Sequence, residues 1–258
     1  MKRGLGVLLG LYAIYAAVAV WIHPGFIYPF TQETFQIEGY VQQQFVTDLG
    51  QIDVVETPGR EGAPAVLFFM GNTGALARFP SGLSLHRDAG RHTVALAYPG
   101  GGGLPGRPAE HDLKARALAA YDWFDARTDQ PIAVHGFSMG TGLALHVAAH
   151  RDVKTVILDA PFFRMCEQMS RMAILPACLL PAVQKWDNAG YVGALMADVM
   201  IQQGIEDQLV LPDDSRRLAR LMTDAGLDVT YHLVPGATHN NLFRRPGYGQ
   251  RVADFLNR

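Results

Sequence analysis

One short segment constrains the fold more than any other: residues 136–140 read Gly-Phe-Ser-Met-Gly and separate a strand pattern from a helical one. The apolar run 131–135 precedes the segment directly. A chain that turns this sharply needs small residues two positions either side of the central one, and Gly136 and Gly140 supply them. Such a turn projects the Ser138 hydroxyl above the end of the strand, beside the free N–H groups of a helix start. The segment therefore predicts a strand–turn–helix unit that presents a serine.

The rest of the chain alternates short apolar runs with helical patterns. Such alternation is typical of a parallel sheet covered by helices. We therefore expect an α/β fold, with a mostly parallel central sheet and helices on both faces. Residues 162–197 break the rhythm, being rich in Met, Leu, Ala and Pro. We interpret them as a small cap insertion, with ordinary packing helices as the alternative. Strands are expected at 52–56, 65–70, 93–98, 131–135, 154–158, 199–202 and 229–234, and helices at 110–127, 139–150, 213–225 and around 252–256.

The N-terminal segment indicates a membrane helix. Lys2 and Arg3 precede an uncharged apolar run, residues 4–22, that is long enough to cross a bilayer. A cleaved signal peptide and a buried core helix are the alternatives. Because positive charges favour a cytoplasmic N-terminus, the remainder would lie outside the cytoplasm, on the periplasmic side in a bacterium, or in the periplasm as a secreted protein after cleavage. We assign residues 1–30 to an anchor or signal with its linker, and 31–258 to the folded domain.

Composition excludes several classes of protein. The chain has 258 residues and a formal net charge of −2, with no basic block beyond the N-terminus, which argues against a nucleic-acid partner. There are two cysteines and no C-x-x-C pair, so a thiolate zinc site is not expected, and neither is any cofactor. Cys166 and Cys178 would be able to pair outside the cytoplasm. Two buried free thiols are the simpler expectation.

A serine becomes a strong nucleophile when a neighbouring base takes its proton. Among nine histidines, His239 lies in the loop 235–241, after the last strand and before the last helix. The order serine, acid, histidine places the base there. We interpret His135 as a packed core residue. Five other histidines are interpreted as surface groups: His86, His92, His111, His146 and His150.

The acid is expected after a later strand than the serine. Asp207 meets that condition, and its carboxylate would hold the His239 ring in one tautomer and stabilise the imidazolium. Glu206 is the neighbouring rival. Asp159, at the end of an earlier strand, is a second rival, whose simpler role is to cap the next turn.

The negative oxygen of a tetrahedral intermediate needs N–H donors. One is expected from the backbone of Met139, directly after the nucleophile. The other is expected from the loop 71–74, and Asn72 is the best single candidate, again through its backbone.

These motifs together resemble the α/β hydrolases, and more narrowly their BEM46-like branch, which is also similar to the ABHD13 and ABHD17 proteins. Residues 68–74 resemble its oxyanion loop and residues 98–103 its glycine-rich loop. Gly204, Asp207 and Val210 resemble its acid loop, and Gly236 with His239 its histidine loop. Met70, Phe137 and Gln203 depart from the pattern: histidine is usual at the first and third positions, and a basic or polar residue is frequent at the second.

The resemblance implies an α/β-hydrolase fold and a membrane-anchored serine hydrolase that cleaves carboxylic ester or thioester bonds through an acyl-enzyme on Ser138. Its partners would be a small-molecule or lipid-like acyl ester and the membrane. A catalytically silent binding or scaffold protein at the membrane is the alternative.

Gly136, Gly140 and Gly142 also resemble the glycine-rich turn of short-chain dehydrogenases. That turn ends the first strand of its fold, however, whereas strand candidates precede this one.

Overall fold

The computed structural model describes residues 2–34 and 37–258. In this part of the chain, eight strands form one sheet in the order β1-β2-β4-β3-β5-β6-β7-β8. β1 and β2 pair in antiparallel fashion, as do β2 and β4, and all other neighbours are parallel. The strands are β1 Val41–Thr47, β2 Gly50–Thr57, β3 Ala65–Phe69, β4 Thr93–Leu96, β5 Ile132–Phe137, β6 Thr155–Asp159, β7 Asp198–Gly204 and β8 Val229–Val234.

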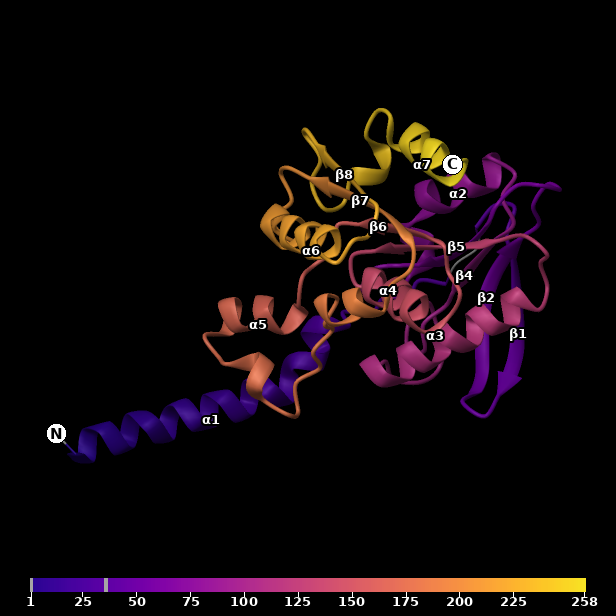
Figure 1. Ribbon diagram of the computed structural model, residues 1–258. Coiled ribbons are helices and arrows are strands. Elements are labelled where there is room, and N and C mark those ends of the chain that lie inside the picture. The colour runs from indigo at the N-terminus through magenta and orange to yellow at the C-terminus, as the bar shows by residue number, and fades with distance from the viewer. Residues whose placement is uncertain (1, 35–36) are drawn as a thin grey trace.

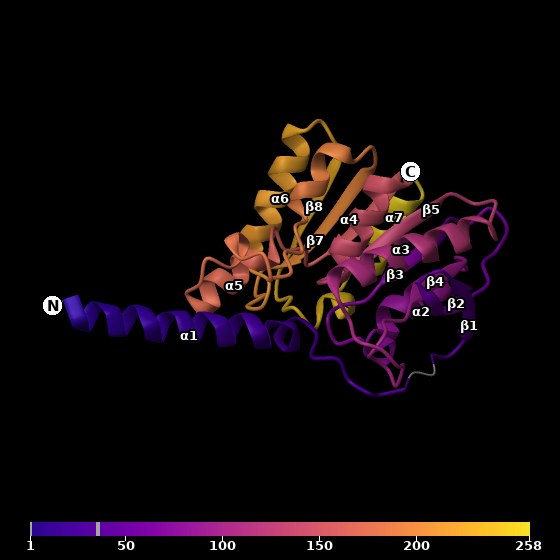
Figure 2. The same cartoon turned by 90° about the horizontal axis from the view of Figure 1, so that it is seen from below.

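Helices cover both faces of the sheet (Figures 1 and 2), as the sequence predicts. α3, α4 and α6 lie on one face, whereas α2 and α7 lie on the other. Alternate side chains of β6 point to opposite faces of the sheet. Val156 and Leu158 join the larger hydrophobic core, and Ile157 packs under α7 on the other face. The helices are α1 Lys2–Ile27, α2 Pro80–Asp88, α3 Glu110–Asp125, α4 Gly140–His150, α5 Met165–Ala173, α6 Pro212–Asp224 and α7 Tyr248–Leu256, with short 3₁₀ turns η1 Leu76–Arg78, η2 Ala177–Leu179, η3 Ala189–Ala194 and η4 Leu242–Arg244.

The expected α/β architecture is confirmed, and two elements of it escaped sequence reasoning. β1 is a Gln-rich edge strand whose side chains are mostly exposed, so it lacks a clear apolar alternation. α2 is a nine-residue helix that begins with Pro80 and contains Gly82. β5 is the fifth strand rather than the first, which agrees with the argument against a dehydrogenase.

α1 projects away from the domain, and α5 lies beside it (Figure 2). Within the described residues, α1 is the one helix that is long and apolar enough to cross a membrane, over Gly4–Ile27. The hydroxyl groups of Tyr12 and Tyr15 donate to the carbonyl oxygens of Ile174 and Ala173, at 2.9 and 2.6 Å. The end of α5 is therefore joined to the middle of α1.

The expectation of two free thiols is wrong. Cys166 and Cys178 form a disulfide with an S–S distance of 2.05 Å. The bond joins the first turn of α5 to η2, twelve residues further on. Spacing alone could not show this pairing, because it depends on how the chain folds back after α5.

Candidate active site

The serine turn has the strained geometry that its glycines suggest. Ser138 has φ of +51°, in the left-handed region that non-glycine residues rarely adopt. A Cβ atom on Gly136 would lie 2.4 Å from the carbonyl oxygen of Gly140, and one on Gly140 would lie 2.1 Å from that of Phe69. The Ser138 N–H donates to the carbonyl oxygen of Asp159 at 2.8 Å and so fixes the turn to the end of β6. Only glycine fits at these two positions, because a Cβ atom would collide with the backbone of a neighbouring segment.

Three side chains from distant parts of the chain meet above this turn. The Nε2 atom of His239 lies 3.0 Å from the Oγ atom of Ser138. The Nδ1 atom of the same ring lies 2.7 Å from Oδ2 of Asp207. All three residues are buried. The structure thus brings together Ser138, His239 and Asp207 in the arrangement of a nucleophile, a base and an orienting acid.

The Asp207 carboxylate is itself held by the loop after β7. Its Oδ1 atom accepts the backbone N–H groups of Leu209 and Val210, at 2.9 and 2.8 Å. The amide of Gln203 donates to Oδ2 at 3.2 Å and to the carbonyl oxygen of Val210 at 3.1 Å. In the sequence Gln203 is only a departure from the branch pattern, and its contact with the acid is evident only in the structure. Glu206 is the rival candidate for the acid. Its backbone N–H group donates to the carbonyl oxygen of Ala237, which fixes the backbone at this position.

The expected oxyanion donors lie on two adjacent segments. Met139 precedes α4, and Asn72 lies in the turn after β3. β3 pairs with β5 directly, and a Cβ atom on Gly71 would lie 3.1 Å from the Phe137 ring, so the Asn72 turn lies beside the serine turn. Over residues 2–34 and 37–258, neither the Met139 nor the Asn72 N–H group donates a hydrogen bond.

Asp159, the second rival for the acid, belongs to a different buried network. Its Oδ2 atom lies 2.7 Å from Nε2 of His135 and accepts the Tyr248 hydroxyl at 2.5 Å. Its Oδ1 atom accepts the Gln202 amide at 3.1 Å. Burial, and then the nearby carboxylate, raise the pKa of Tyr248 well above its usual value. With these donors satisfied inside the core, Asp159 serves the packing of β5, β6 and α7.

The interpretation of His86 as a surface group is wrong. His86 is fully buried, and its Nε2 atom lies 2.9 Å from Nδ1 of His135. Burial, and then His135 and Arg91, lower the pKa of His86 well below its ordinary value. Leu83, three residues earlier, is also buried, so the two side chains share one face of α2. That spacing was the available signal, but the charged residues after His86 obscured it.

In the described part of the chain, no cluster of three or more His, Cys, Asp or Glu side chains has the geometry of a metal site. The contacts of this site are those among the side chains of Ser138, His239 and Asp207.

A mostly parallel sheet in this order, with a serine on the sharp turn after β5 and a histidine after β8, defines an α/β hydrolase. No protein-family model matches the chain. An esterase of Pyrococcus furiosus shares the fold, with a TM-score of 0.70 and 15% identity, covering 89% of this chain and 96% of that one.

Relatives identify the branch. The chain is 32% identical over 190 residues to an uncharacterised protein of Mycobacterium tuberculosis, covering 72% of this chain and 66% of that protein. It is 30% identical over 222 residues to the lysophosphatidylserine lipase ABHD12 of Xenopus tropicalis, covering 75% and 57%. It is 23% identical over 212 residues to the protein bem46 of Schizosaccharomyces pombe, covering 79% and 70%. The chain belongs to the BEM46-like branch of the α/β hydrolases. It spans slightly less than two thirds of the mycobacterial relative and a little over half of the frog one.

Proposed function

We propose that this protein is a membrane-anchored serine hydrolase that cleaves carboxylic ester or thioester bonds through an acyl-enzyme on Ser138. The observation that carries the proposal is the chain of two short contacts, 3.0 Å from Ser138 to His239 and 2.7 Å from His239 to Asp207. The frog relative is named as a lysophosphatidylserine lipase, which fits an acyl ester substrate.

The mechanism follows from the positions of these atoms. Nε2 of His239 takes the proton of Ser138 as its oxygen attacks the acyl carbon. The N–H groups of Met139 and Asn72 stabilise the oxyanion. When the intermediate collapses, the bond to the leaving group breaks and His239 gives its proton to the departing alcohol or thiol. Water then attacks the acyl-enzyme, His239 takes a proton from it and returns one to Ser138, and the carboxylic acid leaves.

The setting of the domain supports an anchored, extracytoplasmic enzyme. From Gly4 onward α1 is uncharged and has the length of a membrane span, and Lys2 and Arg3 stand at its N-terminal end. The disulfide between Cys166 and Cys178 suits an oxidising compartment. In this proposal, residues 1–30 are the anchor and linker, residues 31–258 the catalytic domain, and residues 162–197 the cap.

A fluorophosphonate probe tests the nucleophile directly. The full-length protein should be labelled, and Ser138→Ala should lose both labelling and ester cleavage. Ser84→Ala, on α2, is the matched control and should keep both. Cleavage that persists in folded Ser138→Ala protein would contradict the assignment. A folded wild-type protein that neither takes up the probe nor cleaves esters would instead support the silent scaffold.

A further inference from the structure

The end of α5 and the chain that follows it expose several large apolar side chains. We call residues 172–183 the cap tip. Met172, Ile174 and Leu179 of this segment are 82%, 80% and 81% exposed. No charged residue occurs between Arg171 and Lys185. Single exposed apolar residues are common on soluble proteins, but a contiguous uncharged group of them marks an interaction surface.

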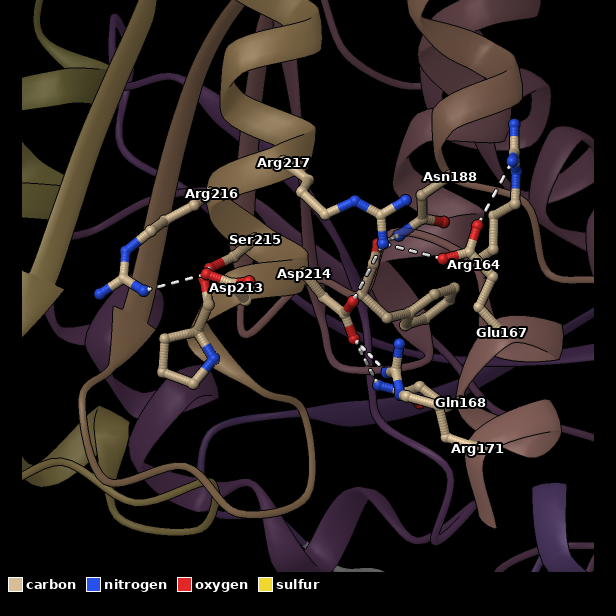
Figure 3. A network of polar contacts seen from close by, with 12 residues as sticks. Arg164, Glu167, Gln168, Arg171, Asn188, Asp213, Asp214, Ser215, Arg216 and Arg217 are labelled. Atoms are coloured by element: carbon tan, nitrogen blue, oxygen red, sulfur yellow. Dashed lines mark hydrogen bonds and ion pairs between the residues drawn. The ribbon is translucent and has the colours of Figure 1, made fainter. Parts of the chain in front are cut away.

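α5 separates this apolar surface from a charged one. Its polar side chains face α6, where Arg171 bonds to Asp214 at 2.9 Å and Glu167 bonds to Arg217 at 2.8 Å (Figure 3). Met169 and Met172 lie on the other side of the helix and line a groove against α1. One face of α5 is thus committed to the domain, and the other faces the anchor.

The groove between α1 and the cap tip is almost entirely apolar. Its volume is about 400 Å³, and its walls include Val18, Ile22 and Phe26 from α1 and Met169, Met172 and Leu175 from the cap. A groove of this kind would be poorly solvated in water. Its volume and apolar lining suit a hydrocarbon chain.

The position of the groove along α1 places it at the depth of the membrane. Residues 4–22 rise by about 27 Å as a helix, close to the roughly 30 Å of a bilayer core. The contacts of Tyr12 and Tyr15 with Ile174 and Ala173 lie near the middle of that length. If α1 spans the bilayer, the cap tip therefore has to enter hydrocarbon.

The backbone of the cap tip is prepared for such an environment. Backbone carbonyl groups inside hydrocarbon need internal donors, because water is not there to supply them. The hydroxyls of Tyr12 and Tyr15 serve two of them. The Lys185 ammonium group donates to three more, those of Ala177, Cys178 and Leu180, at 3.2, 2.8 and 2.6 Å.

We propose that the cap tip is a second membrane contact, which inserts beside α1 into the leaflet next to the catalytic domain, with the acyl chain of a membrane lipid in the groove between them. The inference rests on the membrane-anchor part of the proposed function. It does not depend on the catalytic residues.

The test uses the full-length protein in phosphatidylcholine vesicles. Both native cysteines are in the disulfide, so one introduced cysteine is the sole free thiol and takes an environment-sensitive fluorophore. The three variants are Ile174→Cys on the cap tip, Leu9→Cys in the anchor and Val46→Cys on β1. Val46 is the matched control, because it is apolar and 81% exposed at the far edge of the sheet from α1 (Figure 1).

Lipids that carry a nitroxide on the acyl chain report which labels enter hydrocarbon. We expect the Ile174 label to be quenched nearly as strongly as the Leu9 label, and several-fold more than the Val46 label. Quenching at Leu9 but not at Ile174 would overturn the inference and leave the anchor intact. Quenching at neither would mean that the anchor itself is wrong. A blue-shifted Ile174 label without quenching would indicate a contact with a second copy and would also overturn the inference.

Two further measurements check the result independently of the cysteine label. Because a thiol at position 174 lies near the disulfide, Ile174→Trp is read in parallel by quenching with brominated acyl chains, after subtraction of the wild-type signal. A phosphatidylcholine with a photoreactive acyl chain should crosslink to peptides of the cap tip and α1. Val18→Trp, which fills the groove, should reduce that crosslinking several-fold. Unchanged crosslinking in this variant would place the acyl chain elsewhere.

Discussion

Two buried histidine–aspartate pairs lie beside Ser138: His239 of one pair contacts its hydroxyl, and the backbone of Asp159 in the other accepts its N–H group. Substitution of each aspartate by asparagine should separate their roles. In Asp207→Asn the N–H groups of Leu209 and Val210 hold the new amide oxygen at the Oδ1 position. The amide NH₂ group then faces Nδ1 of His239. That nitrogen has to become an acceptor, so the ring proton moves to Nε2, opposite Ser138, and the ring can no longer take the serine proton.

The expected loss in Asp207→Asn is about 10⁴ in kcat, the size seen when a triad histidine is held in the wrong tautomer. At about 1.36 kcal/mol per tenfold, this is roughly 5.5 kcal/mol of transition-state stabilisation. Thermal stability should change much less, because the substitution costs one charged hydrogen bond, on the order of 1–3 kcal/mol.

Asp159→Asn should show the opposite pattern. The carboxylate of Asp159 accepts bonds from the side chains of His135, Tyr248 and Gln202, all inside the core. Removing one partner from a buried charged network costs about 3–5 kcal/mol. In a protein of this size 1 kcal/mol shifts Tm by roughly 2–4 °C, so Tm should fall by roughly 10 °C. The backbone carbonyl that holds the Ser138 N–H remains, so kcat of the folded enzyme should change little.

The assay pairs hydrolysis of a short-chain chromogenic ester, at a temperature where both variants are folded, with thermal unfolding followed by circular dichroism. The reasoning is refuted if Asp207→Asn keeps nearly full activity. It is also refuted if folded Asp159→Asn loses activity as deeply as Asp207→Asn, because Asp159 would then act in the chemistry.

Three other predictions concern the turn, the disulfide and pH. Gly140→Ala should abolish probe labelling, because its Cβ would lie 2.1 Å from a backbone carbonyl, whereas Gly193→Ala, with nothing within 4 Å, should label normally. Replacing Cys166 and Cys178 by serine should lower the free energy of unfolding by about 3 kcal/mol, and a reductant should lower the wild-type Tm but leave the double variant unchanged. Burial lowers the pKa of His86 in the folded protein. Below about pH 6.5, His86 is therefore protonated in the unfolded chain but not in the folded protein, and the stability falls as the pH decreases. Between pH 6.5 and pH 5.5, the free energy of unfolding measured in urea should fall by about 1 kcal/mol less in His86→Gln than in the wild type. Equal losses would contradict a lowered pKa of His86.

The chain order of the elements is what made the site predictable from sequence. Ser138, Asp207 and His239 each follow a strand, and parallel strands bring their carboxyl ends to one edge of the sheet. The buried network around Asp159 was not predictable in the same way. It needs His86 of α2, a helix too short to give a clear periodic signal, to meet a histidine that lies in β5. The disulfide likewise depends on the path of the chain after α5, which no repeat or spacing specifies.

The structure accommodates Met70, Phe137 and Gln203, the three residues that depart from the branch pattern. Gln203 donates to the Asp207 carboxylate, so a neutral amide supports the acid without a charge of its own. The carbonyl oxygen of Met70 accepts the Tyr98 hydroxyl at 2.8 Å, which fixes the start of the loop 71–74 through the backbone of Met70 rather than through its side chain. Phe137 alters the surroundings of the base: its ring centre lies 5.0 Å from that of His239 and 5.0 Å from that of Phe243. The rings of Phe137 and Phe243 thus form an apolar wall on one side of His239. These departures thus leave the contacts among Ser138, His239 and Asp207 in place, and Phe137 makes the surroundings of His239 less polar.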